Sequence, residues 1–293
     1  MKIIPNEVKT NVLHSYLLSA IAPRPICFAS TMDKDGNPNL SPFSFFNVFG
    51  SNPTTLIFSP ARRVRDNTIK HTLENLYETK EVVINVVNHA MVQQASLSSC
   101  EFERGMDEFV KAGFTKLRSD KVKPYRVAES PVQMECTVRQ IIETGNGGGA
   151  GNLVICEIVA MHIQDYILDE HLQIDPHKID LVARMGADFY CRASGSALFE
   201  VEKPNTKIGI GVDNLPFSIR DSKVLSGNNL GMLANVSEIP SIDPRFSDEK
   251  LTVIVQYFSI NPQEMEKEIH IYAQQLLHNN DIGAAWQVLL AST

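Results

Sequence analysis

Two short segments near the start of the chain hold most of the residues whose types and spacing suggest ligand binding. The first, residues 39–47 (NLSPFSFFN), places three aromatic side chains among small polar groups. Aromatic rings can support a flat heteroaromatic ligand, and backbone N–H and C=O groups near Pro42 and Ser44 can bind its polar edge. A core strand with ordinary serines would have the same composition, so this segment alone leaves both interpretations open.

The second segment, residues 59–68 (SPARRVRDNT), joins the end of an apolar run to three arginines and a predicted helix. Apolar residues follow helical spacing from Asn67, and Asp66 is a suitable N-cap. A helix N-terminus flanked by Arg and Thr side chains can hold a phosphate monoester. A solvated basic turn with Asp66 as a plain cap is the alternative interpretation.

A glycine-rich segment, residues 145–152 (GNGGGAGN), also invites a phosphate-binding interpretation. It lacks the Gly-Lys-Ser/Thr ending of a P-loop and the Gly-x-Gly-x-x-Gly order between a strand and a helix. We therefore predict a mobile hairpin tip. His171 and His177 lie in a polar stretch without a third ligand at suitable spacing, so we interpret this stretch as a solvated loop and predict no metal site.

The cysteines are odd in number and widely spaced, with no Cys-x-x-Cys pair. They are Cys27, Cys100, Cys136, Cys156 and Cys191. This pattern predicts reduced thiols rather than a disulfide framework or a zinc site. Cys136 and Cys156 lie in apolar, strand-like runs, so we expect them to be buried as small apolar side chains.

The elements around these segments are short strands with helices inserted between them. Strands are predicted at 26–30, from residue 38, and at 54–59, 81–87, 132–142 and 153–165, the last two as antiparallel partners; helices are predicted at 10–22, from residue 67, and at 89–99 and 106–112. The Asp-Gly pair at 35–36 predicts a hairpin turn. Because strands and helices do not alternate regularly, we predict a barrel with helical additions rather than a doubly wound sheet.

Beyond Ser194 the composition shifts toward Gly, Asn, Pro and Ser, as in residues 204–211 and 228–231. We expect such a segment to lack a large core of its own. It ends in two predicted amphipathic helices, at 262–277 and near 282–290. We therefore predict two parts, a barrel domain at 1–195 and an extension at 196–293 that packs on the barrel or on another subunit.

The overall composition narrows the class of protein. The 293 residues are 43% hydrophobic and 21% charged, which is ordinary for a folded chain. A net charge of −7 argues against nucleic acid as a partner. No apolar run approaches the roughly 18 residues that span a bilayer, and the start lacks the apolar region of a signal peptide. We therefore expect a cytoplasmic protein with no membrane partner.

Taken together, the sequence resembles the flavin reductase-like family of FMN-binding split barrels, which includes flavin reductases and flavoredoxin-like proteins. The resemblance runs from about residue 10 to 193, and the order of its motifs carries it. The motifs are 22–26 (APRPI), 29–31 (AST), 39–47, 65–68 (RDNT), 81–86 (EVVINV), 107–114 (DEFVKAGF), 129–136 (ESPVQMEC) and 183–186 (ARMG) with Tyr190. It implies a mainly β fold with helices, an antiparallel Greek-key barrel with peripheral helices and a C-terminal arm ending in helices.

The resemblance also implies a set of cofactor-binding residues. The flavin ring and ribityl chain would be lined by Ser30, Thr31, Ser41, Pro42, Phe43, Ser44 and Asn47, and the phosphate would be surrounded by Ser59, Arg65, Asp66 and Thr68, with Arg24 and Arg184 as further candidates. The family often has Lys where Arg65 stands, just before Asp-Thr, and here Asn67 separates Asp66 from Thr68. The phosphate contact can thus shift by one residue, and Arg can still bind it.

The activity implied by this resemblance is that of an NAD(P)H-dependent flavin reductase. Electrons would pass from NADH or NADPH through FMN to a flavin or a protein acceptor, in a homodimer. We identify no catalytic residue, because the flavin itself accepts the hydride. The alternative is a non-catalytic FMN-binding electron carrier of flavoredoxin type without its own NAD(P)H site. A third interpretation is a barrel that binds haem, with His71, His89, His162, His171 or His177 as axial ligand.

Overall fold

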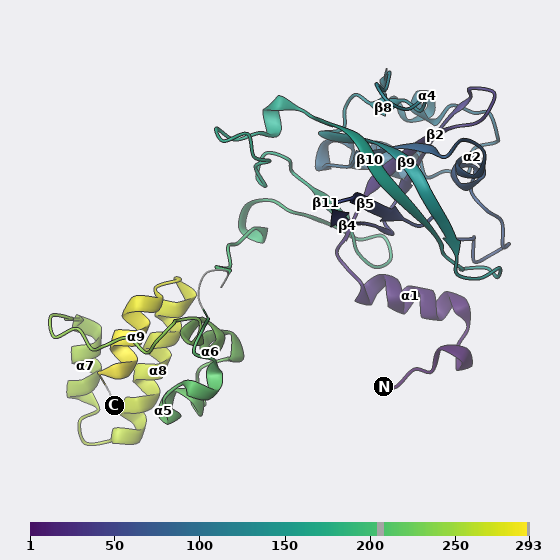
Figure 1. Ribbon diagram of the computed structural model, residues 1–293. Coiled ribbons are helices and arrows are strands. Elements are labelled where there is room, and N and C mark those ends of the chain that lie inside the picture. Colours follow the sequence, from purple (N-terminus) through teal and green to yellow (C-terminus); the bar gives the residue numbers. More distant parts are fainter. Residues whose placement is uncertain (204–207, 292–293) are drawn as a thin grey trace. The chain divides into compact units, whose positions relative to one another are not determined.

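The structure is a computed structural model that describes residues 1–203 and 208–291 (Figure 1). It divides into two compact units, Met1–Phe199 and the residues from Glu200 onward. Residues 204–207, part of the segment with shifted composition, and residues 292–293 of the predicted extension lie outside the described residues. In the part of the chain that is described, no helix is long and apolar enough to cross a membrane.

A seven-stranded antiparallel sheet organises the first unit, with strand order β3-β2-β6-β9-β10-β5-β4. Its strands are β2 (Cys27–Met32), β3 (Pro38–Phe43), β4 (Phe46–Ser51), β5 (Thr54–Phe58), β6 (Glu81–Val86), β9 (Val132–Glu143) and β10 (Asn152–Ile163). The edge strands β3 and β4 do not pair with each other among the described residues, so the sheet stays open. The prediction of a mainly antiparallel fold with inserted helices is confirmed.

The longest strands, β9 and β10, are neighbours in this sheet and form one long hairpin (Figure 1). Their register runs from Val132 opposite Ile163 to Glu143 opposite Asn152, with two irregularities between. The glycine-rich segment is the connection between them. The predicted antiparallel pairing across this segment is therefore confirmed.

Two apolar clusters cover the two faces of the central strands. Cys27 and Ala29 of β2 belong to the first cluster, together with Leu73 of helix α2 (His71–Thr79). Phe28 belongs to the second, together with Phe109 of helix α4 (Glu108–Ala112). Helix α3 (Val92–Leu97) also contributes to the second cluster. Side chains alternate between the faces of a strand, so β2 is buried on both sides.

The predicted burial of Cys136 and Cys156 is confirmed, and Cys27 of β2 is buried as well. Cys27 and Cys136 are fully buried and Cys156 is 1% exposed. Burial raises the pKa of all three thiols, that of Cys156 to about 12. The neutral thiol is therefore the stable form of each, and they act as core side chains.

Short elements complete the first unit. They are helix α1 (Thr10–Ala20), the small sheet of β1 (Arg24–Pro25), β11 (Val182–Arg184) and β12 (Tyr190–Arg192), and the pair β7 (Lys116–Leu117) and β8 (Arg126–Val127). Helix α1 ends before Pro23, as predicted. Helix α4 ends at Gly113, whose φ of 71° is the left-handed conformation that glycine adopts at low cost, also as predicted.

Helix α2 begins four residues later than predicted. Its first residue is His71 and its N-cap is Lys70, without a side-chain capping bond. Asp66 instead accepts hydrogen bonds from the backbone N–H and the hydroxyl of Thr68, at 3.0 and 2.7 Å. Between them Asn67 has a φ of 60°, which a right-handed helix does not accommodate. The predicted helix start at Asn67 with Asp66 as N-cap is therefore wrong.

The second unit consists of helices and has its own core, so the expectation that this segment lacks one is wrong. Its helices are α5 (Phe217–Arg220), α6 (Gly227–Ala234), α7 (Glu249–Tyr257), α8 (Pro262–His278) and α9 (Ile282–Leu290). Ile269, Ala273 and Trp286 are at most 1% exposed within its apolar cluster. Contact of this unit with the barrel or with another subunit stays a prediction.

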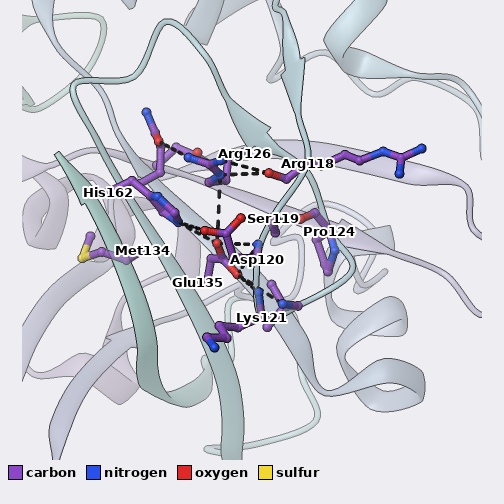
Figure 2. A network of polar contacts seen from close by, with 12 residues as sticks. Arg118, Ser119, Asp120, Lys121, Pro124, Arg126, Met134, Glu135 and His162 are labelled. Carbon is purple, nitrogen blue, oxygen red and sulfur yellow. Dashed lines mark hydrogen bonds and ion pairs between the residues drawn. The ribbon is translucent and has the colours of Figure 1, made fainter. Parts of the chain in front are cut away.

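A buried carboxylate anchors the loop before β8 in the first unit (Figure 2). Glu135 of β9 is fully buried and accepts backbone N–H groups from Asp120 at 2.9 Å and Lys121 at 2.6 Å. His162 of β10 lies 2.7 Å from its Oε1, and the Arg126 guanidinium 4.0 Å away. Burial acts to raise the pKa of Glu135, but these donors outweigh it and hold the pKa below its usual range.

We predict that Glu135→Gln lowers the free energy of opening of residues 118–124 by about 3 kcal/mol at pH 7, because backbone donors lose a buried anion. Amide hydrogen exchange of that segment measures it. The carboxylate stabilises the fold fully above its unfolded pKa of about 4.3, and this contribution is lost as the pH falls through the lower folded-state pKa. The difference between wild type and variant must therefore shrink in acid.

Glu170→Gln is the matched control, because the Glu170 side chain is 86% exposed. It should leave the exchange of residues 118–124 unchanged at both pH values. Equal effects of the two substitutions would contradict the anchoring role of Glu135.

Candidate functional site

The predicted ring-binding block forms the corner between β3 and β4. Phe43 is 6% exposed and packs its ring 5.2 Å from that of Phe58, whereas Phe45 is 40% exposed. Ser41 and Pro42 are half-buried on β3. The backbone N–H of Ser59 donates to Phe45 O at 2.8 Å, so the end of β5 lies against this corner. The structure therefore brings predicted ring and phosphate residues together here.

Lys70 lies beside this corner and was not among the predicted residues. Its Nζ donates to Ser41 Oγ at 3.3 Å and lies 4.8 Å from the centroid of the Phe43 ring. No carboxylate lies within ion-pair distance of Lys70 in the described part of the chain. Burial, followed by the charge of Arg63, lowers the pKa of Lys70. A half-buried cation that forms no ion pair, although the charges of Glu101 and Glu108 act on it, is suited to an anionic ligand.

The segment between β5 and α2, residues 61–69, is named here the arginine loop. Arg63 donates to Glu101 at 2.9 Å and to Thr68 Oγ1 at 2.8 Å, and the Arg65 guanidinium also contacts Glu101. The Thr68 hydroxyl and N–H hold the pKa of Asp66 well below its usual range. The predicted phosphate residues Arg65, Asp66 and Thr68 thus lie together, but they are exposed and bonded mainly within the loop and to Glu101.

The glycine-rich tip, residues 145–151, docks on the arginine loop. Arg62 N donates to Ala150 O at 2.8 Å, and Gly149 N donates to Arg62 O at 3.0 Å. Directly after the tip, the backbone N–H of Asn152 donates to the Oγ of Ser59, a predicted site residue, at 3.1 Å. The tip was predicted to be mobile, but in the structure its backbone is hydrogen-bonded to a neighbouring loop.

Ser30 and Thr31 lie behind the corner rather than on its surface, since both are fully buried. Thr31 Oγ1 accepts from Asn75 of α2 at 3.1 Å, and Asn39 accepts from Thr72 at 2.8 Å. Asn39 in turn donates to Glu108 of α4 at 2.8 Å. This buried polar network connects β2, β3, α2 and α4. The Ser30 hydroxyl has no hydrogen-bond partner in the described structure.

Three predicted residues lie elsewhere. Asn47 is exposed on the edge strand β4, where its Oδ1 accepts from the N–H of Val48. Arg24 and Arg184 pair across β1 and β11 of the small sheet. Arg184 stacks at 4.6 Å over the Tyr190 ring. Arg24 is 6% exposed and donates to the carbonyls of Leu18, Ile21 and Met185, so it caps the C-terminal end of α1.

The histidines considered as metal or haem ligands are dispersed. Within residues 1–203 and 208–291, the group with metal-ligand spacing is Asp120, Glu135 and His162, whose ligand atoms lie within 4.8 Å of one another. Because both Glu135 oxygens already accept N–H groups (Figure 2), we assign this group a structural role. His171 has an exposed side chain and contacts Glu170.

The comparison with protein families decides the assignment. Residues 19–177 match the model of the flavin reductase like domain, which is more than half of the chain. The chain belongs to the flavin reductase-like family. An uncharacterized protein of Aquifex aeolicus is 33% identical over 201 residues, which cover 69% of this chain and 100% of that protein.

Solved structures show the same fold for the first unit. Component B of nitrilotriacetate monooxygenase from Bacillus cereus aligns with a TM-score of 0.63 and 25% identity, covering 69% of this chain and 98% of that one. A split-barrel protein from Shewanella frigidimarina aligns with a TM-score of 0.58 and 27% identity, covering 68% and 95%. The split-barrel prediction is confirmed.

Sequence reasoning missed three residues that the structure places at this site. Lys70 was hidden because Asp66 is the better N-cap by type, although Lys70-His71-Thr72 directly precedes the apolar positions of α2. Glu101 lies 36 residues from Arg65, and no local pattern connects them. Gly148 contacts the arginine loop, but glycine content alone does not reveal a backbone contact.

We predict that Arg24→Lys destabilises α1 by about 2 kcal/mol, because one ammonium cannot bind the carbonyls at the end of α1 and that of Met185 together. Amide exchange of residues 10–21 should speed up, while binding of flavin should stay within twofold of wild type. A loss of flavin binding with unchanged amide exchange would indicate instead that Arg24 binds the cofactor. Arg118→Lys is the control, because the hydrogen bonds that involve Arg118 use its backbone carbonyl.

Proposed function

We propose that this chain binds FMN at the β3–β4 corner and passes electrons from NADH or NADPH through it to a flavin or protein acceptor. Membership of the flavin reductase-like family supports a flavin oxidoreductase. The position of Lys70, a half-buried cation beside Ser41 and Phe43, is the observation that favours a phosphorylated flavin. The homodimer and the cytoplasmic location belong to the same proposal; the homodimer rests on resemblance and the location on the distribution of apolar residues in the sequence.

The donor set at the corner fits FMN. Lys70 offers positive charge for a phosphate, and Ser41 and Ser59 offer hydroxyls for it or for the ribityl chain. The exposed Phe45 offers a ring face beside them, and the buried Phe43 supports the corner from below. A few polar groups beside aromatic side chains are typical of a cofactor site.

Lys70 is a better phosphate ligand than the predicted Arg65 in this arrangement. The Arg65 side chain is 65% exposed and its charge is matched by Glu101 and Asp66. Lys70 is the N-cap of α2 and is followed by His71 and Thr72, so a Lys-x-Thr sequence stands at the helix start. This is the residue order that the resemblance led us to expect at Arg65. In this proposal we therefore assign the phosphate contact to Lys70, next to the predicted residues 65–68.

The chemistry of FMN, when bound, is to accept a hydride from a reduced pyridine nucleotide and to pass on two electrons. The residues of this chain bind and orient the flavin and exclude water from it. The Lys70 ammonium neutralises phosphate charge, and Ser41 holds that ammonium in place. Phe43 and Phe58 form the apolar floor of the corner. Thr31, Asn39 and Asn75 fix β2, β3 and α2 relative to one another from behind.

We predict that Lys70→Met weakens FMN binding by about 10- to 100-fold, because one charge-assisted contact contributes about 1.5–3 kcal/mol. Riboflavin, which lacks the phosphate, should bind the variant and the wild type equally. Titration followed by flavin fluorescence measures both affinities. Lys34→Met, in the exposed β2–β3 turn, is the control and should bind both flavins as wild type does. Equal losses for FMN and riboflavin would refute the phosphate role.

The visible spectrum of the purified protein, with chromatography of the released chromophore, tests the cofactor itself. We expect FMN, near one per chain on saturation. Anaerobic mixing with NADH and with NADPH then tests the electron donor, and bleaching of the flavin absorbance is the expected result. Bound FMN that stays oxidised with both nucleotides would indicate the electron carrier instead. A chain that takes up no FMN would refute the proposal.

A further inference from the structure

The glycine-rich tip and the arginine loop are joined by several hydrogen bonds. Two backbone hydrogen bonds, Arg62 N to Ala150 O and Gly149 N to Arg62 O, join the segments in both directions. The Asn67 side chain adds a third, from Nδ2 to Asn146 O at 3.0 Å. Both ends of the loop are therefore tied to the tip, although the segments are some 80 residues apart in sequence.

Gly148 is the residue that permits this approach. A Cβ at this position would lie 3.0 Å from Val64 O and 3.1 Å from Arg63 O, both backbone atoms. A Cβ at Gly147 would meet no atom within 4 Å. Neither glycine has a φ in the left-handed region. An added methyl group at residue 148 therefore displaces the backbone of the arginine loop by a few tenths of an ångström, and it has no such effect at residue 147.

The arginine loop transmits this position to the start of α2. Arg63 N donates to Thr68 O at 2.9 Å, so the loop closes on itself. The Arg63 guanidinium also donates to Ile69 O at 2.8 Å, one residue before Lys70. A shift of the Arg63 backbone thus moves the peptide that leads into Lys70.

We propose that the glycine-rich tip is a positioning element for phosphate binding, with Gly148 as the residue that sets the place of the arginine loop and of Lys70. The tip itself contributes no phosphate ligand in this arrangement. This inference rests on the proposed binding of FMN. Affinity for a phosphate is sensitive to displacements well below 1 Å when several groups must converge on it.

The test compares Gly148→Ala with Gly147→Ala in the full chain. Gly148→Ala should weaken FMN binding about tenfold and leave riboflavin binding unchanged, because only the phosphate contacts move. Gly147→Ala should bind both flavins as wild type does. A general loss of structure would weaken both flavins equally, so the ratio of the two affinities separates positioning from damage.

Limited trypsin digestion supplies a readout that needs no flavin. Cleavage after Arg62, Arg63 and Arg65 should be faster in Gly148→Ala than in Gly147→Ala, since the added Cβ weakens the contact between the loop and the tip. Should Gly148→Ala fail to fold by circular dichroism, Asn67→Gly replaces it. That variant removes the bond to Asn146 together with the bond from Arg62 Nε to Asn67 Oδ1, at a residue whose φ of 60° glycine adopts freely, and should show the same two effects.

The outcomes distinguish the two proposals. FMN binding by wild type with an unchanged FMN-to-riboflavin ratio in Gly148→Ala would overturn the positioning role and leave the proposed function intact. Cleavage rates equal to those of Gly147→Ala would also count against it, because the loop would then not depend on residue 148. No FMN binding by wild type would overturn both proposals.

Discussion

The burial of strand β2 on both faces is the constraint on which the rest of the first unit depends. Cys27 and Ala29 belong to one apolar cluster and Phe28 to the other. A shift of one residue in register would exchange these two sets, so the strand has a single stable alignment. The register of β2 fixes that of its neighbour β3, with Ala29 opposite Ser41. The site at the corner is therefore positioned by the core rather than by its own contacts.

Hydrogen bonds within the core add directional specificity to this apolar framework. Glu108 accepts from Asn39 and from the backbone N–H of Leu40, and burial raises the pKa of its carboxyl group although these donors act against the rise. Thr72 and Asn75 connect the same network to α2. Buried polar groups are costly unless they are bonded, so this arrangement disfavours other placements of α2. The start of α2, and Lys70 with it, acquires a defined position.

Most of the sheet could be predicted from the sequence because its strands alternate apolar and polar residues and its turns use recognisable chemistry. The start of α2 could not, since an N-cap is identified by residue type, whereas the φ of 60° at Asn67 is set by contacts with Arg62 and Asn146. The core of the second unit was missed for a related reason. Its Asn, Ser and Asp residues include N-caps of short helices, namely Ser226, Asp248, Asn261 and Asp281, rather than parts of an unstructured segment. The contact of Glu101 with Arg65 depends on the tertiary fold alone.

The single tryptophan of the chain, Trp286, is buried in the core of the second unit. Its emission therefore reports on the helical unit by itself, without a background from the barrel. Indole emission overlaps the near-ultraviolet absorption of an oxidised flavin, and resonance energy transfer between them falls steeply with separation. With FMN bound in the first unit, the protein would carry a natural donor and acceptor pair, one in each unit. Relative movement of the two units would then be visible as a change in tryptophan lifetime, with no label attached.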